Sequence, residues 1–158
     1  RAVASLKEKM RDFHVLAVGE CYENRDKYTE LINKLDIIEH ITWFDQYIPD
    51  KDVAIYFSAA DVVALPYRSA SQSGITQIAY NYDLPVIVTK VGGLPEIVDE
   101  GKSGFIINPE NPDELADVLA ENISTNTFNE MGSYIQSFKL KYSWDYFVEG
   151  IEKVYRRL

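Results

Sequence analysis

Short hydrophobic runs alternate with amphipathic segments along most of this chain. Runs rich in β-branched residues, each ended by glycine, proline or polar residues, are typical of buried strands, and they lie at residues 13–19, 41–44, 61–66, 85–89 and 104–107. Between them, apolar positions recur three or four residues apart, which predicts helices at about residues 24–35, 50–59 and 75–82, and further helices starting near residues 111 and 143. This alternation predicts an α/β fold with a Rossmann-like, doubly wound parallel sheet in a single domain, residues 1–158.

Several details of this prediction can be checked. The run 61–66 is almost continuously apolar, so we expect it in the centre of the sheet. Asp50 and Asn111 are predicted helix N-caps, and residues 124–142 have the weakest pattern. The chain opens with a helix already under way and without an initiator methionine. We therefore expect residues 1–158 to be a fragment of a longer protein.

Composition narrows the functional classes. Hydrophobic residues make up 46% and charged residues 26% of the 158 residues, which is typical of a globular domain. The net charge of −9 argues against nucleic acid as a partner and against the whole surface lying on an anionic membrane. The single cysteine, Cys21, suits a reducing, cytoplasmic location, and no Cys/His spacing suggests a metal site. No apolar run approaches the length of a membrane span.

Four loops follow predicted strands at their carboxyl ends, where open α/β sheets bind ligands. The most suggestive precedes the predicted helix at residue 75, because small residues let a ligand approach the backbone and a helix start offers free N–H groups to a phosphate. The predicted donor-binding residues there are Ser71, Ser73, Gly74, Ile75, Thr76 and Gln77. Serine and glycine are also the ordinary residues of a loop and N-cap, and this alternative remains open.

Other candidates lie on the remaining loops. Gly92 and Gly93, followed by Glu96, suit either a backbone cradle for a sugar or phosphate or an ordinary tight turn before a helix. Arg25 is a candidate cation for a diphosphate. Tyr47 is a candidate to stack on a base, although aromatic residues in loops also pack locally.

The order and spacing of several motifs resemble the C-terminal domain of the group 1 retaining glycosyltransferases, which have the GT-B fold. In this family a strand ending in proline precedes a loop, a helix and a Pro-Val-Ile strand, followed by a Gly-Gly-x-x-Glu and a Gly-x-x-Gly-Phe motif. The matching pieces are Leu65-Pro66, Pro85-Val86-Ile87, Gly92-Gly93-Leu94-Pro95-Glu96 and Gly101-Lys102-Ser103-Gly104-Phe105, and the closing residues 142–158 resemble the family's last helix.

One departure from the family concerns two glutamates that flank its phosphate-binding loop. Counting back from Pro85, they should fall at Ala70 and Ile78, and neither position is acidic. The nearest polar substitutes include Gln72 and Gln77, which are the only candidates for a catalytic role. Gln77 can hydrogen-bond a ribose hydroxyl, but it carries no charge.

The resemblance implies a hexosyltransferase that moves a sugar from a nucleotide-diphosphate sugar to an acceptor hydroxyl with retention. It also implies that no metal or cofactor is needed and that the loop at Tyr47 and Ile48 holds the base. The fold's first strand and the N-terminal acceptor-binding domain would precede Arg1, and any peripheral membrane contact would come from that half. A fragment of this kind is expected to fold without transferring sugar. Bacterial polysaccharide or cell-envelope glycan synthesis is the expected setting.

Three alternatives remain from the sequence alone. A sugar-nucleotide epimerase of the same architecture would share the donor site but needs acid/base side chains, and the loop near Ala70 has no carboxylate. A non-catalytic nucleotide-binding module agrees with the missing glutamates. A flavodoxin-like or receiver domain ranks last, because the first strand end offers only Glu20 where a receiver needs clustered aspartates.

Overall fold

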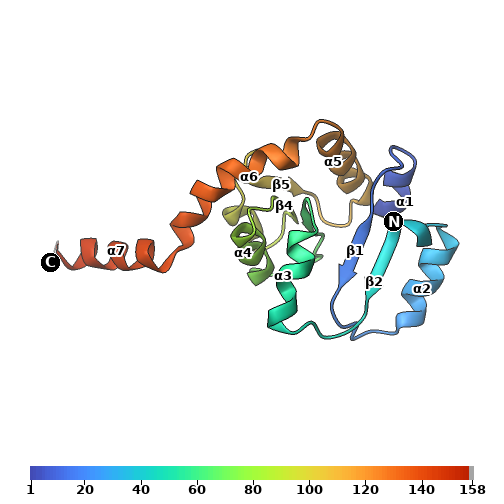
Figure 1. The fold of residues 1–158 in the computed structure, drawn as a ribbon, viewed down its shortest axis with the longest axis horizontal. Helices are drawn as coiled ribbons and strands as arrows, with labels where there is room; N and C mark the ends of the chain where they lie inside the picture. Colours follow the sequence, from blue (N-terminus) through green and yellow to red (C-terminus); the bar gives the residue numbers. More distant parts are fainter. Residues whose placement is uncertain (157–158) are drawn as a thin grey trace.

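A computed structural model describes residues 1–156 as an α/β fold. The five strands are β1 (Val15–Val18), β2 (Ile41–Phe44), β3 (Val63–Leu65), β4 (Val86–Thr89) and β5 (Gly104–Ile107). Every strand pairing is parallel, as predicted. The strands form two sheets instead of one: β1 pairs with β2, and the other three have the order β3-β4-β5 (Figure 1).

The helices follow the predicted alternation with the strands. They are α1 (Ala2–Lys7), α2 (Arg25–Lys34), α3 (Asp50–Ser58), α4 (Gly74–Asn81), α5 (Pro112–Ser124), α6 (Thr127–Phe138) and α7 (Trp144–Tyr155), with short 3-10 turns η1 (Ile38–His40), η2 (Leu94–Ile97) and η3 (Lys139–Tyr142). Asn111 caps α5 as predicted, accepting from the Glu114 N–H. The predicted cap at Asp50 is wrong, because Pro49 is the N-cap and Asp50 is the first helical residue. There its carboxylate still favours the helix dipole.

The structure adds a helix to one weakly patterned segment and corrects one prediction about the sheet. The weakly patterned residues 124–142 contain α6, which buries Phe128, Met131 and Ile135 on one face. The run 61–66 does not lie in the centre of a sheet, because β3 pairs only with β4. The central strand of three is β4, whose four residues are all buried. An apolar run indicates burial, but it does not say which neighbours provide that burial.

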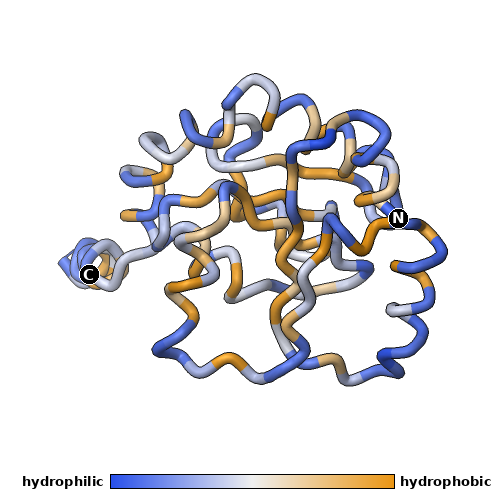
Figure 2. Tube along the Cα trace, turned by 45° about the vertical axis from the view of Figure 1, so that its right-hand side comes forward, coloured by the Kyte–Doolittle hydropathy of each residue, from blue (hydrophilic) through white to orange (hydrophobic). Residues whose placement is uncertain are grey.

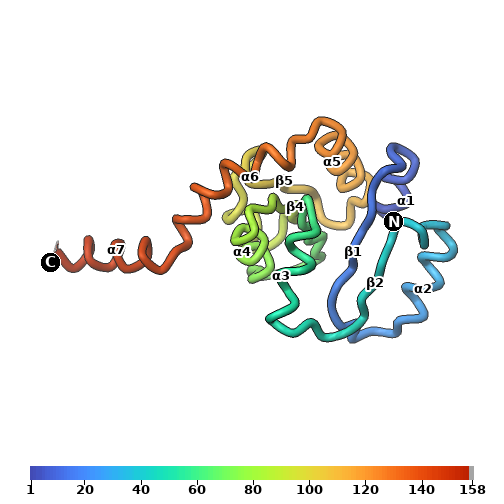
Figure 3. The backbone as a smooth tube through the Cα atoms, in the orientation of Figure 1, coloured from blue at the N-terminus to red at the C-terminus, as the bar shows by residue number. Residues whose placement is uncertain are grey.

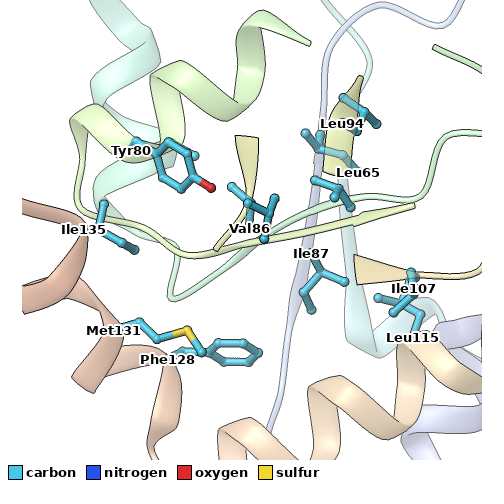
Figure 4. Close-up of a cluster of buried hydrophobic side chains, with 13 residues drawn as sticks. Leu65, Tyr80, Val86, Ile87, Leu94, Ile107, Leu115, Phe128, Met131 and Ile135 are labelled. Carbon is cyan, nitrogen blue, oxygen red and sulfur yellow. The ribbon is translucent and has the colours of Figure 1, made fainter. Parts of the chain in front are cut away.

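The main hydrophobic core lies around β4, between that strand and helices α4, α5 and α6 (Figure 4). Val86, Ile87 and Val88 are fully buried, and Leu115 and Phe128 pack into the same cluster from the helices. Hydrophobic segments gather inside the body of the molecule, whereas hydrophilic segments occupy its periphery (Figure 2). This core fixes β3 and β4, and with them the loops that follow these strands.

The C-terminal helix α7 extends away from this body (Figure 3). The helix predicted from Ser143 onwards is present, and Ser143 caps it by accepting from the Tyr146 N–H. Its apolar residues Trp144 and Phe147 are exposed instead of packed on the core. Arg157 and Leu158, at the end of the predicted last helix, lie outside the described residues. Among residues 1–156, the helices are too short or too polar to cross a membrane.

A buried tyrosine joins α4 to the segment before β5. The Tyr80 hydroxyl donates to the Ile97 carbonyl at 2.8 Å and lies 3.1 Å from the Ser103 hydroxyl oxygen. Ser103 in turn accepts from the Asp99 N–H at 2.9 Å. Burial raises the pKa of the Tyr80 hydroxyl to about 12.

This tyrosine predicts a loss of stability at alkaline pH. An unfolded tyrosine has a pKa of about 10, so the neutral Tyr80 stabilises the fold below that pH, and the contribution is lost as pH rises from about 10 towards about 12. Ultraviolet titration of tyrosinate should show a group with a pKa of about 12 that disappears in Tyr80→Phe. If every tyrosine in the folded protein titrates near pH 10, the network is wrong.

Candidate functional site

The loops that follow β3 and β4 pack tightly against each other. The Gly93 N–H donates to the Ser71 carbonyl at 2.8 Å. A Cβ atom on Gly92 would lie 1.8 Å from the Ala70 carbonyl oxygen, and Gly92 has a positive φ of 50°. The predicted glycine pair therefore serves contact between two loops. This contact fixes the backbone just before α4.

Helix α4 begins at an open face of the molecule. Ser73 is its N-cap and accepts from the Ile75 N–H at 3.3 Å. Gly74, the first helical residue, faces open space, because a Cβ atom built there meets nothing within 4 Å. The first N–H groups of a helix have no partner within it and carry partial positive charge. The start of α4 therefore offers a place for an anion.

The other candidates on this loop and helix differ in their surroundings. The Thr76 hydroxyl is buried and donates to the Ser73 carbonyl at 2.6 Å, so it is engaged within the helix start. Gln72 lies over Gly93, with its side-chain nitrogen 3.7 Å from a Cβ atom built on that glycine. Gln77 is half-buried one turn into the helix. Of the two glutamines, only Gln72 lies in the loop before the helix.

The remaining candidates lie around this centre. Glu96 is exposed on η2, and its N–H donates to the Gly93 carbonyl at 3.2 Å. Tyr47 and Ile48 lie on the loop after β2, on the wall of a cavity of about 860 Å³ between the two sheets, which we call the inter-sheet cavity. Ile75 lines the same cavity from α4. The loop after β2 and the start of α4 therefore border one cavity.

Arg25 belongs to a separate group at the ends of β1 and β2. Its guanidinium lies 3.4 Å from the Asp45 carboxylate and over the Trp43 ring, with 5.2 Å to the ring centroid. Asp45 also accepts from the Cys21 N–H at 2.8 Å. These contacts tie the loop after β1 to β2. A ligand would have to compete with Asp45 for this arginine.

A second arginine, Arg68, lies in the loop after β3, near the loop after β1. Arg68 pairs with Glu110 at 3.2 Å. The pKa of Glu23, in the loop after β1, is lowered first by its hydrogen bond from Tyr28, then by Lys27, and also by the charge of Arg68. The loops after β1 and β3 are therefore close enough for their charges to interact.

Three further residues near these loops were not among the donor-site candidates predicted from the sequence. Glu20 and Tyr22 line the inter-sheet cavity from the loop after β1, and the Tyr22 hydroxyl donates to Glu20 at 2.8 Å. Thr89 donates to the Tyr67 carbonyl at 2.6 Å and so joins β4 to the loop after β3. The position of Glu20 after a strand was a usable signal, whereas nothing in the sequence distinguishes Thr89 from other strand threonines. The described residues contain no group of three or more His, Cys, Asp or Glu side chains placed to hold a metal ion.

Sequence comparison finds relatives among enzymes of one family. The family model for glycosyl transferases group 1 matches residues 1–125. A D-inositol 3-phosphate glycosyltransferase of Corynebacterium jeikeium is 33% identical over 129 residues, which is 81% of this chain and 30% of that protein. The chain thus spans about a third of the length of this relative.

Structural comparison shows which fold the chain shares with solved glycosyltransferases. HepE of Anabaena, solved in complex with UDP, aligns with 99% of this chain at a TM-score of 0.81 and 21% identity, over 44% of its own length. The isolated C-terminal domain of a group 1 glycosyl transferase from Francisella tularensis aligns with 90% of this chain at a TM-score of 0.78 and 20% identity, over 77% of that domain. The fold is therefore that of the C-terminal, Rossmann-like half of GT-B enzymes. By its family-model match and its curated relatives, the chain belongs to the group 1 glycosyltransferases.

Proposed function

We propose that this chain is the donor-binding domain of an enzyme that binds a nucleoside-diphosphate sugar and transfers the sugar, with retention, to an acceptor hydroxyl. The observation that carries the proposal is the open start of α4. Gly74 leaves space in front of the helix, Ser73 caps one N–H, and the two packed loops hold both residues in place.

The start of α4 suits the leaving group of this reaction. Negative charge grows on the diphosphate as the bond to the sugar breaks, and fixed N–H dipoles stabilise that charge without reorganising. A helix N-terminus supplies such dipoles to a phosphate. Under this proposal no metal is needed for the leaving group, and Tyr47 and Ile48 hold the base.

The donor and acceptor follow from different observations. HepE has been solved with UDP and with UDP-glucose, so UDP is the first nucleotide to test. The chain spans 30% of the length of the Corynebacterium jeikeium enzyme and 44% of the length of HepE. The acceptor site is therefore assigned to a part of the protein outside residues 1–158, and this part alone is expected to transfer no sugar. Bacterial glycan assembly is the proposed setting.

Replacing Gly74 with valine tests the donor site. A Cβ atom at Gly74 meets nothing within 4 Å, so we expect the variant to fold, with the valine side chain in the space before the helix. We expect UDP affinity to fall at least tenfold, or about 1.4 kcal/mol, in calorimetric titration of the enzyme. Gly150→Val is the matched control, because this glycine on α7 also faces open space. Unchanged UDP affinity in Gly74→Val would reject the site.

A product assay separates the remaining functions. Incubating the enzyme with a UDP-sugar and candidate acceptors should give UDP and a glycoside that keeps the anomeric configuration. A free epimer of the sugar would identify an epimerase instead. Saturable binding without turnover of any donor would identify a nucleotide-binding module.

A further inference from the structure

The inter-sheet cavity places the loops of the proposed donor site in a fixed order. Within residues 1–156, its lining includes strand residues of β1 and β3 but none of β2. Because β1 pairs with β2, the strands β1 and β3 face each other across the cavity and β2 lies beyond β1. The loop after β1 therefore lies between the loop after β2, which contains Tyr47, and the start of α4, which follows β3. A ligand that reaches from Tyr47 to Gly74 has to pass the loop after β1.

A nucleoside diphosphate has its parts in the same order. The ribose joins the base to the diphosphate, so a base at Tyr47 and a diphosphate at the start of α4 place the ribose beside the loop after β1. This placement of the ribose rests on the proposed function, which assigns the base and the diphosphate to those two ends. The ribose hydroxyls need hydrogen-bond acceptors when they leave water.

Glu20, in the loop after β1, is the carboxylate placed to accept from these hydroxyls. In the described part of the chain, three acidic side chains line the inter-sheet cavity, at Asp12, Glu20 and Asp61. Asp12 and Asp61 precede β1 and β3, so they lie at the opposite end of the strands from the ligand-binding loops. Helix α4 has no acidic residue. In dinucleotide-binding α/β folds an acidic side chain likewise holds a ribose hydroxyl.

The surroundings of Glu20 leave it able to accept from a ligand. Its Oε2 atom accepts from the Tyr22 hydroxyl at 2.8 Å. The pKa of Tyr22 is raised, first by this hydrogen bond, so the proton stays on the tyrosine and the tyrosine remains the donor. Arg25, the cation at the start of α2, pairs with Asp45 instead. Among residues 1–156, no side chain or backbone group donates to the Oε1 atom of Glu20, so this exposed oxygen is open to a ligand.

We propose that Glu20 holds the ribose of the donor, with the ribose hydroxyls donating to its carboxylate, and that Tyr22 is a positioning residue that fixes this carboxylate by one oxygen. A carboxylate accepts hydrogen bonds and does not donate them, which matches two hydroxyl donors. It repels phosphate, so it suits the nucleoside part of the ligand and not the diphosphate. Glu20 therefore selects a ribonucleotide over its 2′-deoxy form.

Calorimetric titration of the full-length enzyme tests this role of Glu20. UDP, ADP and GDP are titrated first, and then the 2′-deoxy form of each one that binds. The unmodified enzyme should prefer the ribonucleotide by about tenfold or more, because hydrogen bonds to a charged acceptor are the strong ones. In Glu20→Gln the preference should fall to about threefold or less, because the amide lacks the charge. An unchanged preference in this variant would overturn the assignment, and so would equal affinities of the unmodified enzyme for the two forms.

Glu23→Gln is the matched control for the loss of charge. Glu23 lies in the same loop, but it accepts from the Tyr28 hydroxyl and does not line the cavity. The preference for the ribonucleotide should stay as in the unmodified enzyme. A fall as large as that in Glu20→Gln would show that the charge of the loop sets the preference, and it would overturn a direct contact with the ribose.

Tyr22→Phe tests the positioning role, because it keeps the ring and removes the hydroxyl. The preference for the ribonucleotide should fall by about threefold, as expected when a neutral hydrogen bond that orients the carboxylate is lost. The same change in a Glu20→Gln background should cause no further fall. A full second loss in the double variant would show that Tyr22 acts independently of Glu20 and would overturn its positioning role.

Failure of the donor site itself gives a different result. Binding of none of the three nucleotides, or binding that Gly74→Val leaves unchanged, would reject the proposed donor site and the role of Glu20 with it. Binding that Gly74→Val weakens, together with a ribose preference that Glu20→Gln does not change, would reject the role of Glu20 alone.

Discussion

Gly104→Ala is expected to lower the free energy of unfolding by about 3–5 kcal/mol, at the large end of single substitutions. Gly104 of β5 pairs with Val86 of β4 in the three-stranded sheet, and a Cβ atom on Gly104 would lie 2.0 Å from the Val86 carbonyl oxygen. That oxygen belongs to a fully buried strand, so it cannot move aside cheaply. The β4–β5 pairing would have to separate locally. Urea denaturation of the variant measures the loss.

The control for this substitution is Gly101→Ala, three residues earlier. Gly101 has a positive φ of 74°, but a Cβ atom there meets nothing within 4 Å. The free energy of unfolding of Gly101→Ala should fall by only about 1–2 kcal/mol, which is the cost of holding alanine in a left-handed conformation. Equal losses in the two variants would show that backbone conformation decides the effect and that the close approach of β4 and β5 is wrong.

Gly92→Ala is expected to damage stability and donor binding together. A Cβ atom at Gly92 would overlap the Ala70 carbonyl, and the positive φ adds strain, so the free energy of unfolding should fall by about 2–3 kcal/mol. The loop that contains Ala70 leads into the N-cap Ser73 and the start of α4. Displacing it moves the N–H groups proposed to face the diphosphate. UDP affinity should therefore fall at least tenfold in titration.

Two readouts separate this effect from general destabilisation. Gly104 pairs with Val86 at the start of β4, whereas the loop of Gly92 follows the other end of that strand, so folded Gly104→Ala should bind UDP with nearly normal affinity. Gly92→Ala should bind weakly even under conditions where it is fully folded. Normal affinity in folded Gly92→Ala would mean that the packing of the two loops does not position the donor site.

The sequence predicted most helices and strands, because the apolar spacing and the capping residues that define them lie within each element. The strands at residues 41–44 and 104–107 have the predicted bounds, and the cap at Asn111 is formed by its own side chain. Helix α6 has a weak pattern because its buried residues, Phe128, Met131 and Ile135, are diluted by polar neighbours. Its stability comes from packing on the core, which a local pattern does not contain.

The features that could not be predicted depend on contacts between residues far apart in the sequence. The approach of Gly92 to Ala70 joins residues from different loops, and only coordinates could show that the glycines serve that contact. The separation of the sheets could not be predicted either, because an apolar strand such as β3 has the same composition at an edge as at a centre. Arg25 was a candidate by its place after a strand, but its pairing with Asp45 depends on a partner from another loop.

The most direct test of the account is the amide NMR spectrum of the enzyme titrated with UDP. The account predicts that the largest shifts fall on Gly74 and Ile75, with smaller ones at Tyr47 and Ile48, while α7 is unaffected. UDP binding that leaves the Gly74 and Ile75 amides unchanged would contradict a donor site at the start of α4.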